Sequence, residues 1–348
     1  MKVLGIETSC DETAAAVVEN GRVVLSNVVR TQMEIHARFG GVVPEIASRN
    51  HLEAMGPVVR EALARAGLQL GNIDGLAVTI GPGLIGALLV GVQFAKSLSL
   101  GTGLPLVGVN HVQAHVMASF LSENGVRPDF PFVALAVSGG HTSLYLARSF
   151  GDIEMVGRTV DDAAGEAFDK AASQLGLGYP GGVSIERASQ GHDPTSVRFP
   201  RAMVRDGTFN TSFSGLKTAL RRHLEELPDP PDEKQVGDIA ASFQEAVVDV
   251  LVLKTMAAAR AQRVRDVVVA GGVAANLRLR QEMQRAASRE GLAPGAGRAV
   301  YGQWGHDCRL GVSLPVWRAV TGRCAPRTGD GSVCAQREKR LVTGMLRA

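Results

Sequence analysis

Two histidines four residues apart are the strongest chemical signal in the sequence. His111 and His115 lie in a segment that reads as a helix over residues 111–121. Side chains four positions apart share one helix face, so both imidazoles could bind one metal ion. A pair of surface or helix-capping histidines is the alternative, and an isolated pair favours it. A metalloprotease is a third interpretation. That motif needs Glu directly after the first histidine as general base, and Val112 stands there instead.

Three loops rich in small residues each follow an apolar segment. They span residues 7–13, 138–142 and 271–276. Small residues let backbone N–H groups face an anion, and a helix start adds a favourable dipole. Asp11 in the first loop could orient a metal-bound water or a reacting group. Each loop alone is more typical of a tight turn. Three of them in one chain favour a nucleotide site.

These loops and histidines need a scaffold, and the apolar pattern predicts one. Strands are expected at residues 3–6, 14–18 and 23–28, with an Asn-Gly turn between the last two. The same strand–loop–strand–turn–strand pattern recurs at residues 132–156, which indicates a duplicated domain. Helical patterns lie between and after the two copies, so the chain is an α/β protein. We place the boundary between its two lobes near residue 110.

Composition sets broad limits on the function. The 348 residues are 45% hydrophobic and 20% charged, which suits two medium lobes with real cores. The net charge of +3 permits an RNA partner without arguing for one. The four cysteines form no CxxC pair, so we expect a cytoplasmic protein without disulfides. No apolar run reaches the roughly 18–20 residues of a membrane span, and no membrane association is expected.

Nine segments in one order resemble a single family. They are residues 5–13, 36–45, 81–83, 110–115, 137–142, 161–170, 179–182, 212–217 and 271–276. Over about residues 1–290 the chain resembles the bacterial TsaD proteins, relatives of the KEOPS catalytic subunit. The resemblance implies a duplicated, actin/Hsp70-like (ASKHA) two-lobed α/β fold with an interlobe cleft. It also implies transfer of a threonylcarbamoyl group from threonylcarbamoyl-AMP to N6 of the adenosine beside the anticodon of tRNA.

The resemblance further implies which residues act and what they bind. His111 and His115 would hold one divalent metal ion per subunit, with iron (Fe2+) favoured and zinc possible, and Asp11 would assist the transfer. Expected partners are tRNA, a TsaB-like paralogue and a TsaE-like ATPase. A non-catalytic scaffold paralogue remains an alternative, although it would be expected to lack the histidine pair. Contacts to the adenylate would come from Ala136, Val137, Ser138, Gly139, Gly140, Asp169, Gly182 and Asn276.

The C-terminal segment departs from the family pattern. The expected domains are residues 1–110, 111–299 and an atypical tail at 300–348. The family supplies a third metal ligand, an aspartate, in a Cys-Thr-Asp-Asn motif near its end, and this chain has no such motif. Codons that encode residues 300–309, read one base later, can spell Cys-Thr-Asp-Asn-Gly-Ala-Met-Ile-Ala-Ala. We therefore predict that a frameshift replaced the natural end, and that the tail packs poorly.

Overall fold

Two five-stranded sheets form the framework of the protein. The computed structural model describes residues 1–39, 42–121, 128–289 and 299–301. The first sheet has the order β3-β2-β1-β4-β5, and the second has the order β10-β9-β6-β7-β8. The strands of the first are β1 (Lys2–Glu7), β2 (Glu12–Glu19), β3 (Val23–Thr31), β4 (Gly75–Gly81) and β5 (Leu106–Asn110). Those of the second are β6 (Phe132–Val137), β7 (Thr142–Ser149), β8 (Asp152–Arg158), β9 (Asp266–Ala270) and β10 (Ala299–Tyr301).

The two sheets repeat one topology. In each, the first strand pairs antiparallel with the second and parallel with a strand that arrives after a helical crossover. The predicted duplication is therefore confirmed. The predicted Asn-Gly hairpin is also present: Asn20 and Gly21 have φ values of 51° and 61°. These left-handed conformations match the twist of the flanking strands, and Asn and Gly tolerate them best.

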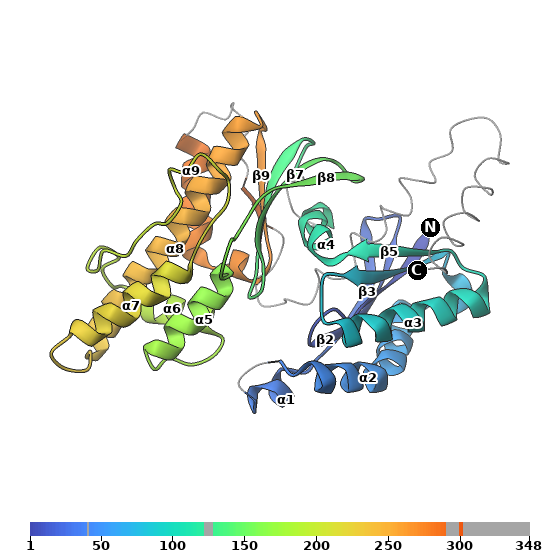
Figure 1. Cartoon of the computed structure of the whole chain (residues 1–348). Coiled ribbons are helices and arrows are strands. Elements are labelled where there is room, and N and C mark those ends of the chain that lie inside the picture. The colour runs from blue at the N-terminus through green and yellow to red at the C-terminus, as the bar shows by residue number, and fades with distance from the viewer. Residues whose placement is uncertain (40–41, 122–127, 290–298, 302–348) are drawn as a thin grey trace.

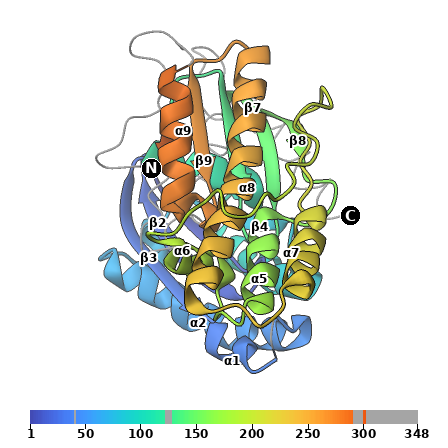
Figure 2. The same ribbon diagram turned by 90° about the vertical axis from the view of Figure 1, so that its left-hand side faces the viewer.

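Helices cover the outer face of each sheet. α2 and α3 pack on the first sheet, while α5 to α9 lie over the second (Figures 1 and 2). Each of these layers encloses its own apolar core. The helices are α1 (Met33–Ala37), α2 (Pro44–Arg65), α3 (Ile85–Thr102), α4 (His111–Met117), α5 (Ala164–Gln174), α6 (Gly181–Ser189), α7 (Ser214–Glu226), α8 (Glu233–Ala261) and α9 (Leu277–Arg289).

α4 lies between the two sheets (Figure 1). Val112 and Val116 pack against apolar residues of the second sheet. Ala114 contacts Val3, Ala77 and Val109 of the first. The short helix therefore belongs to both lobes, and its alternate faces are fixed by two separate cores. This is the element that carries both histidines.

Three expectations about elements need correction. The helix expected over residues 111–121 ends at Met117 and tightens into a 3-10 turn, Ala118–Leu121. The sequence pattern predicts a helix over residues 275–287, and the structure has a 3-10 turn at Gly272–Ala275 followed by α9 at Leu277–Arg289. Helix α6 was not predicted, because its nine residues carry too short an apolar pattern.

One further correction concerns membrane spans. Within the described part of the chain, α3 is long and apolar enough to cross a membrane by length and composition alone. The core helix of a soluble protein passes the same test, and α3 packs on α2 and β4. A single helix of this kind is weak support for membrane insertion.

The first residues of the atypical tail belong to the second sheet. Val300 and Tyr301 belong to β10, which pairs parallel with β9 at the edge of the second sheet. The sheet thus continues two residues past the boundary expected at 299. The predictions that the remaining tail is frameshifted and packs poorly concern residues 302–348, which lie outside the described residues.

Candidate metal and anion site

Helix α4 presents the histidine pair at the junction of the lobes. The side chain of Asn110 caps the helix by accepting hydrogen bonds from the backbone N–H groups of Val112 and Gln113, at 3.0 and 3.1 Å. His111 is therefore the first helical residue, and His115 follows one turn later on the same side. Since neighbouring faces of α4 are buried in both cores, the direction of these two rings is determined by packing.

The two imidazoles converge through their Nε2 atoms. Nε2 of His115 lies 3.0 Å from Nε2 of His111, and the rings meet at 86°. Burial, together with the nearby His111, lowers the pKa of His115 to about 3, so this ring is neutral. Neutral imidazole nitrogens that face a common point are good donors for iron or zinc. Among the described residues, no group of three His, Cys, Asp or Glu side chains could hold a metal ion. The pair thus fits two positions of a metal site.

A buried carboxylate stands behind His111. Glu7, at the end of β1, accepts hydrogen bonds from the backbone N–H of Ser9 and the hydroxyl of Thr79. Its Oε2 also lies 3.4 Å from Nδ1 of His111. Burial alone would raise the pKa of Glu7, but the contact with His111 and the hydrogen bonds from Ser9 and Thr79 outweigh it, and the pKa lies below its ordinary value. Glu7 is therefore an anion. It was not among the predicted site residues.

The loop after β6 forms the second part of the site. Ala136 and Val137 are buried in the strand, and Ser138 begins a tight turn in which its N–H donates to the carbonyl of His141. Side-chain-sized space is open at Gly139 and Gly140. This space leaves room for an anion beside the turn. All five predicted loop residues are thus adjacent, with two inside the strand and three in the turn.

His141 joins this loop to the histidine pair. Its ring centroid lies 6.4 Å from that of His111, although the two residues are 30 positions apart in the sequence. Burial, followed by the nearby His111, lowers the pKa of His141. The anion loop and the metal-type site are therefore neighbours. His141 was missed as a site residue, although it lies in the segment 137–142 that resembles the family.

Asp169 and Gly182 come together at the start of α6. Oδ1 of Asp169 accepts a hydrogen bond of 2.7 Å from the N–H of Gly181, and burial raises the pKa of this aspartate. Nothing lies within 4 Å of the space where a side chain would stand at Gly182. A surface ion pair between Asp169 and its neighbour Lys170 would be the ordinary alternative to a ligand contact, but Lys170 pairs with Glu166 and Asp162 instead.

Asp11 lies half-buried in the turn between β1 and β2. Burial raises the pKa of Tyr179, and the charges of Asp169 and then of Asp11 raise it further. Tyr179 is 76% exposed. Tyr179 was missed as a site residue, although it lies in the segment 179–182.

Asn276, predicted to contact the adenylate, makes hydrogen bonds within the second lobe. Its side chain is buried, and Nδ2 donates to Gln244 at 2.7 Å. Its Oδ1 accepts from the N–H of Leu279 at 2.9 Å and so caps the start of α9. Both ends of the amide are occupied within the fold.

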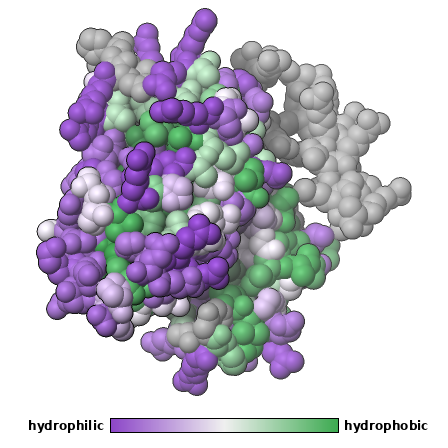
Figure 3. Space-filling model, turned by 60° about the vertical axis from the view of Figure 1, so that its left-hand side comes forward, coloured by the Kyte–Doolittle hydropathy of each residue, from purple (hydrophilic) through white to green (hydrophobic). Residues whose placement is uncertain are grey.

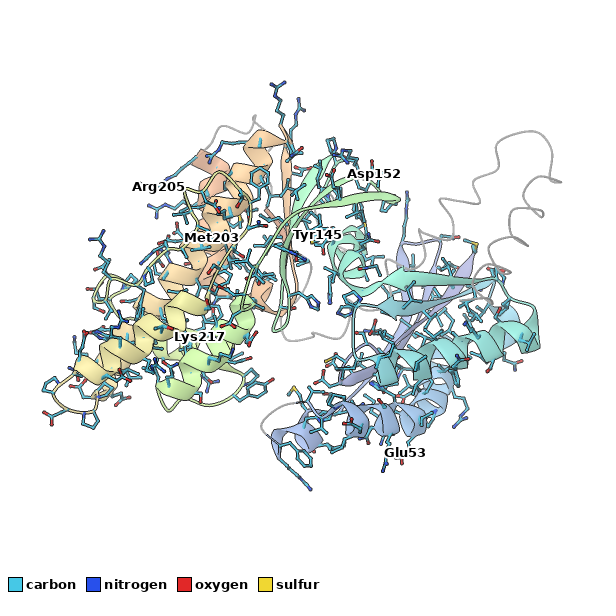
Figure 4. The ribbon with its side chains drawn as sticks, viewed as in Figure 1. Glu53, Tyr145, Asp152, Met203, Arg205 and Lys217 are labelled. Carbon is cyan, nitrogen blue, oxygen red and sulfur yellow. The ribbon has the colours of Figure 1, made fainter. Side chains whose placement is uncertain are left out.

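The sequence also suggests two charged groups as RNA contacts, with a solvated helix face as the alternative: His36, Arg38, Arg49 and His51, and Lys217, Arg221 and Arg222. Three of these residues are engaged within the fold. His36 and His51 are buried, and His51 contacts the hydroxyl of Thr13 at 2.7 Å. Lys217 on α7 (Figure 4) pairs with Asp162.

The fold defines a class of protein. A hexokinase of the ROK type from Thermus thermophilus superposes with a TM-score of 0.53 and 16% identity, over 92% of this chain and 100% of that one. Component A of the (R)-2-hydroxyglutaryl-CoA dehydratase from Acidaminococcus fermentans gives 0.53 and 16%, over 92% and 99%. A HypF protein gives 0.60 and 12%, over 94% and 56%. The chain is an α/β protein of the duplicated, actin/Hsp70-like class.

Sequence relatives narrow this class to one family. The family model TsaD, tRNA N6-adenosine threonylcarbamoyltransferase, matches residues 23–295. A protein of that name from Geotalea uraniireducens is 55% identical over 292 residues, covering 84% of each chain. Another from Anaeromyxobacter dehalogenans is 57% identical over 295 residues, covering 84% of this chain and 87% of that one. The chain belongs to the TsaD family.

Proposed function

We propose that this chain transfers the threonylcarbamoyl group of threonylcarbamoyl-AMP to N6 of the adenosine adjacent to the anticodon, in tRNAs that read codons starting with A. One observation carries the proposal beyond family membership. The histidine pair and the glycine loop come from separate segments, yet His141 of the loop lies 6.4 Å from His111 between ring centroids. One ligand with an anionic part and an acyl part could occupy both.

The reaction requires positioning more than bond activation. N6 of adenosine attacks the carbamoyl carbon, the bond from that carbon to the phosphate oxygen breaks, and AMP leaves as the amine loses a proton. The mixed anhydride already has a good leaving group. The protein must hold a weak amine in line with the carbonyl and stabilise charge on the phosphate and the carbonyl oxygen.

The chain offers groups for each of these tasks. The N–H groups of Gly139 and Gly140 suit the phosphate, while that of Ser138 is donated to His141 within the turn. The N-terminus of α6 at Gly182 adds a favourable dipole. Asp169 suits the ribose hydroxyls as an acceptor. Asp11, on the facing lobe, suits the amine, whose proton it would accept or orient.

The proposed metal is one divalent ion per subunit, with iron favoured and zinc possible. His111 and His115 would hold it, and when bound it would act as a Lewis acid toward an oxygen of the donor. Their convergent Nε2 atoms support this assignment. The third protein ligand is expected from the family's C-terminal aspartate, which this tail lacks.

We further propose that the chain acts in the cytoplasm with a TsaB-like paralogue and a TsaE-like ATPase. α2 and α3 pack together and expose large apolar side chains, among them Leu52, Ile85 and Leu89. Hydrophobic side chains are visible at the surface, toward the lower right of the view, in Figure 3. Exposed apolar residues of this kind favour contact with a protein partner.

A reconstituted reaction tests the proposed function. Purified protein with both partner subunits, labelled threonine, bicarbonate, ATP, the adenylate-forming enzyme and tRNA should place label in tRNA. A chain with a frame-corrected tail that transfers no label would refute the transferase. A scaffold paralogue would also leave tRNA unlabelled until a catalytic relative was added. Peptide cleavage lost in His111→Ala would support a protease instead, although the buried Val112 occupies the position of its general base.

A further inference from the structure

Glu7 is a buried carboxylate, and such a group needs hydrogen-bond partners that stabilise it inside the fold. It ends the central strand β1 and its side chain is almost inaccessible to water. An ionised carboxylate in such a place is strongly destabilising unless hydrogen bonds satisfy its oxygens. Two donors come from the first lobe, the N–H of Ser9 and the hydroxyl of Thr79. The third neighbour is the ring of His111, which is 104 residues away in sequence.

The contact with His111 involves the nitrogen that does not face His115. Nδ1 of His111 lies 3.4 Å from Oε2 of Glu7 and 3.2 Å from Oγ of Ser9. Its Nε2 lies 3.0 Å from Nε2 of His115. A carboxylate only accepts hydrogen bonds, so the proton of His111 belongs on Nδ1 and the lone pair on Nε2. The ring is thereby held in the form and direction that a metal ligand requires.

We propose that Glu7 is a positioning residue for the metal site: its carboxylate holds the His111 ring through Nδ1 and so turns the Nε2 lone pair toward the ion. This inference rests on the proposed function, which supplies the metal. Carboxylates that hold the far nitrogen of a ligating histidine commonly raise metal affinity by about 10- to 100-fold. Thr79 and Ser9 in turn hold Glu7, so β1, β4 and the loop after β1 all contribute to the direction of one ring.

The test compares zinc binding to Glu7→Gln and to the unchanged protein. Zinc ion alone is the probe, measured by competition with a chelating dye, because it is stable to oxidation. We expect Glu7→Gln to weaken the zinc Kd by about 10- to 100-fold. Glu53→Gln is the matched control, since Glu53 lies exposed on α2 far from the site (Figure 4). Its Kd should equal that of the unchanged protein.

A second measurement, by NMR, reports on the hydrogen bond between His111 and Glu7. The ring proton on Nδ1 of His111, assigned by its loss in His111→Ala, should give a downfield proton resonance that moves upfield in Glu7→Gln. This readout needs no metal. If the unchanged protein binds no zinc but the resonance behaves as expected, the metal in the proposed function is refuted while the Glu7–His111 bond stands.

Folding is monitored in parallel by circular dichroism. Should Glu7→Gln fail to fold, Glu7→Asp keeps the charge but withdraws it by one methylene, and the same loss of zinc affinity is expected. A folded variant with a Kd within twofold of the unchanged protein and an unmoved ring-proton resonance would overturn the proposal.

Discussion

Gly165 is the residue at which one methyl group should damage the site most selectively. It is the second residue of α5, and its N–H donates to the carbonyl of Ser138 at 3.2 Å. A Cβ atom added there would lie 2.5 Å from that carbonyl oxygen and 2.6 Å from Cα of Gly139. Both are backbone atoms of the anion loop, so no side chain can rotate away to relieve the overlap.

The size of the effect follows from these distances. Ordinary contact begins near 3.4 Å, so the loop or the helix must move by about 1 Å. Inserting a methyl group into a tightly packed region typically costs about 1–3 kcal/mol. A displacement of about 1 Å in groups that position a substrate can reduce the rate about 100-fold. We therefore expect Gly165→Ala to remain folded while kcat/KM for transfer to tRNA falls roughly 100-fold.

The assay is label transfer from threonylcarbamoyl-AMP to tRNA, with stability followed by urea denaturation. Gly101→Ala is the control, because Gly101 is also helical and nothing lies within 4 Å of its added Cβ. This control should keep full activity. A Gly165→Ala protein that transfers label within twofold of the unchanged rate would refute the close approach of α5 to the loop.

Three further outcomes are expected. Phe243→Ala should lower the free energy of unfolding in urea by about 3–5 kcal/mol, because this fully buried ring packs against Phe168 and Phe199. The hydrogen bond from Lys254 lowers the pKa of Asp206 to about 2, so its stabilisation is present above the ordinary pKa near 3.8 and is lost as the pH falls toward 2. Urea midpoints between pH 5 and pH 2 should therefore fall more steeply for the unchanged protein than for Asp206→Asn, and parallel curves would contradict this. Resequencing the gene should find an inserted or lost base near codon 300. An uninterrupted reading frame that encodes residues 300–348 as they stand would refute the predicted frameshift.

Local sequence patterns determined much of the fold. The Asn-Gly turn, the apolar runs of the buried strands and the four-residue spacing of the histidines are encoded by neighbours in the chain. Their physical consequences do not depend on distant segments. The pattern predicts a strand over residues 132–137 and a helix over residues 44–64, and β6 and the start of α2 at Pro44 agree with it. The repeat of that pattern also predicted the duplicated lobes, because each copy had to bury its own apolar faces.

Contacts between distant segments were decided only by the tertiary structure. Whether a polar residue is buried depends on what packs over it, so the interior positions of His36 and His51 could not be read from composition. The same holds for Asn276, whose side-chain amide makes hydrogen bonds with Gln244 and with the first turn of α9.

The histidine pair shows most clearly which features local sequence determined and which the tertiary structure decided. Sequence spacing put His111 and His115 on one side of a helix. Only the packing of α4 between two sheets turned them toward each other and set His111 against Glu7. The physical reason is that a ring's direction and proton position depend on neighbours from other strands, which the order of strands in the sheet brings within reach.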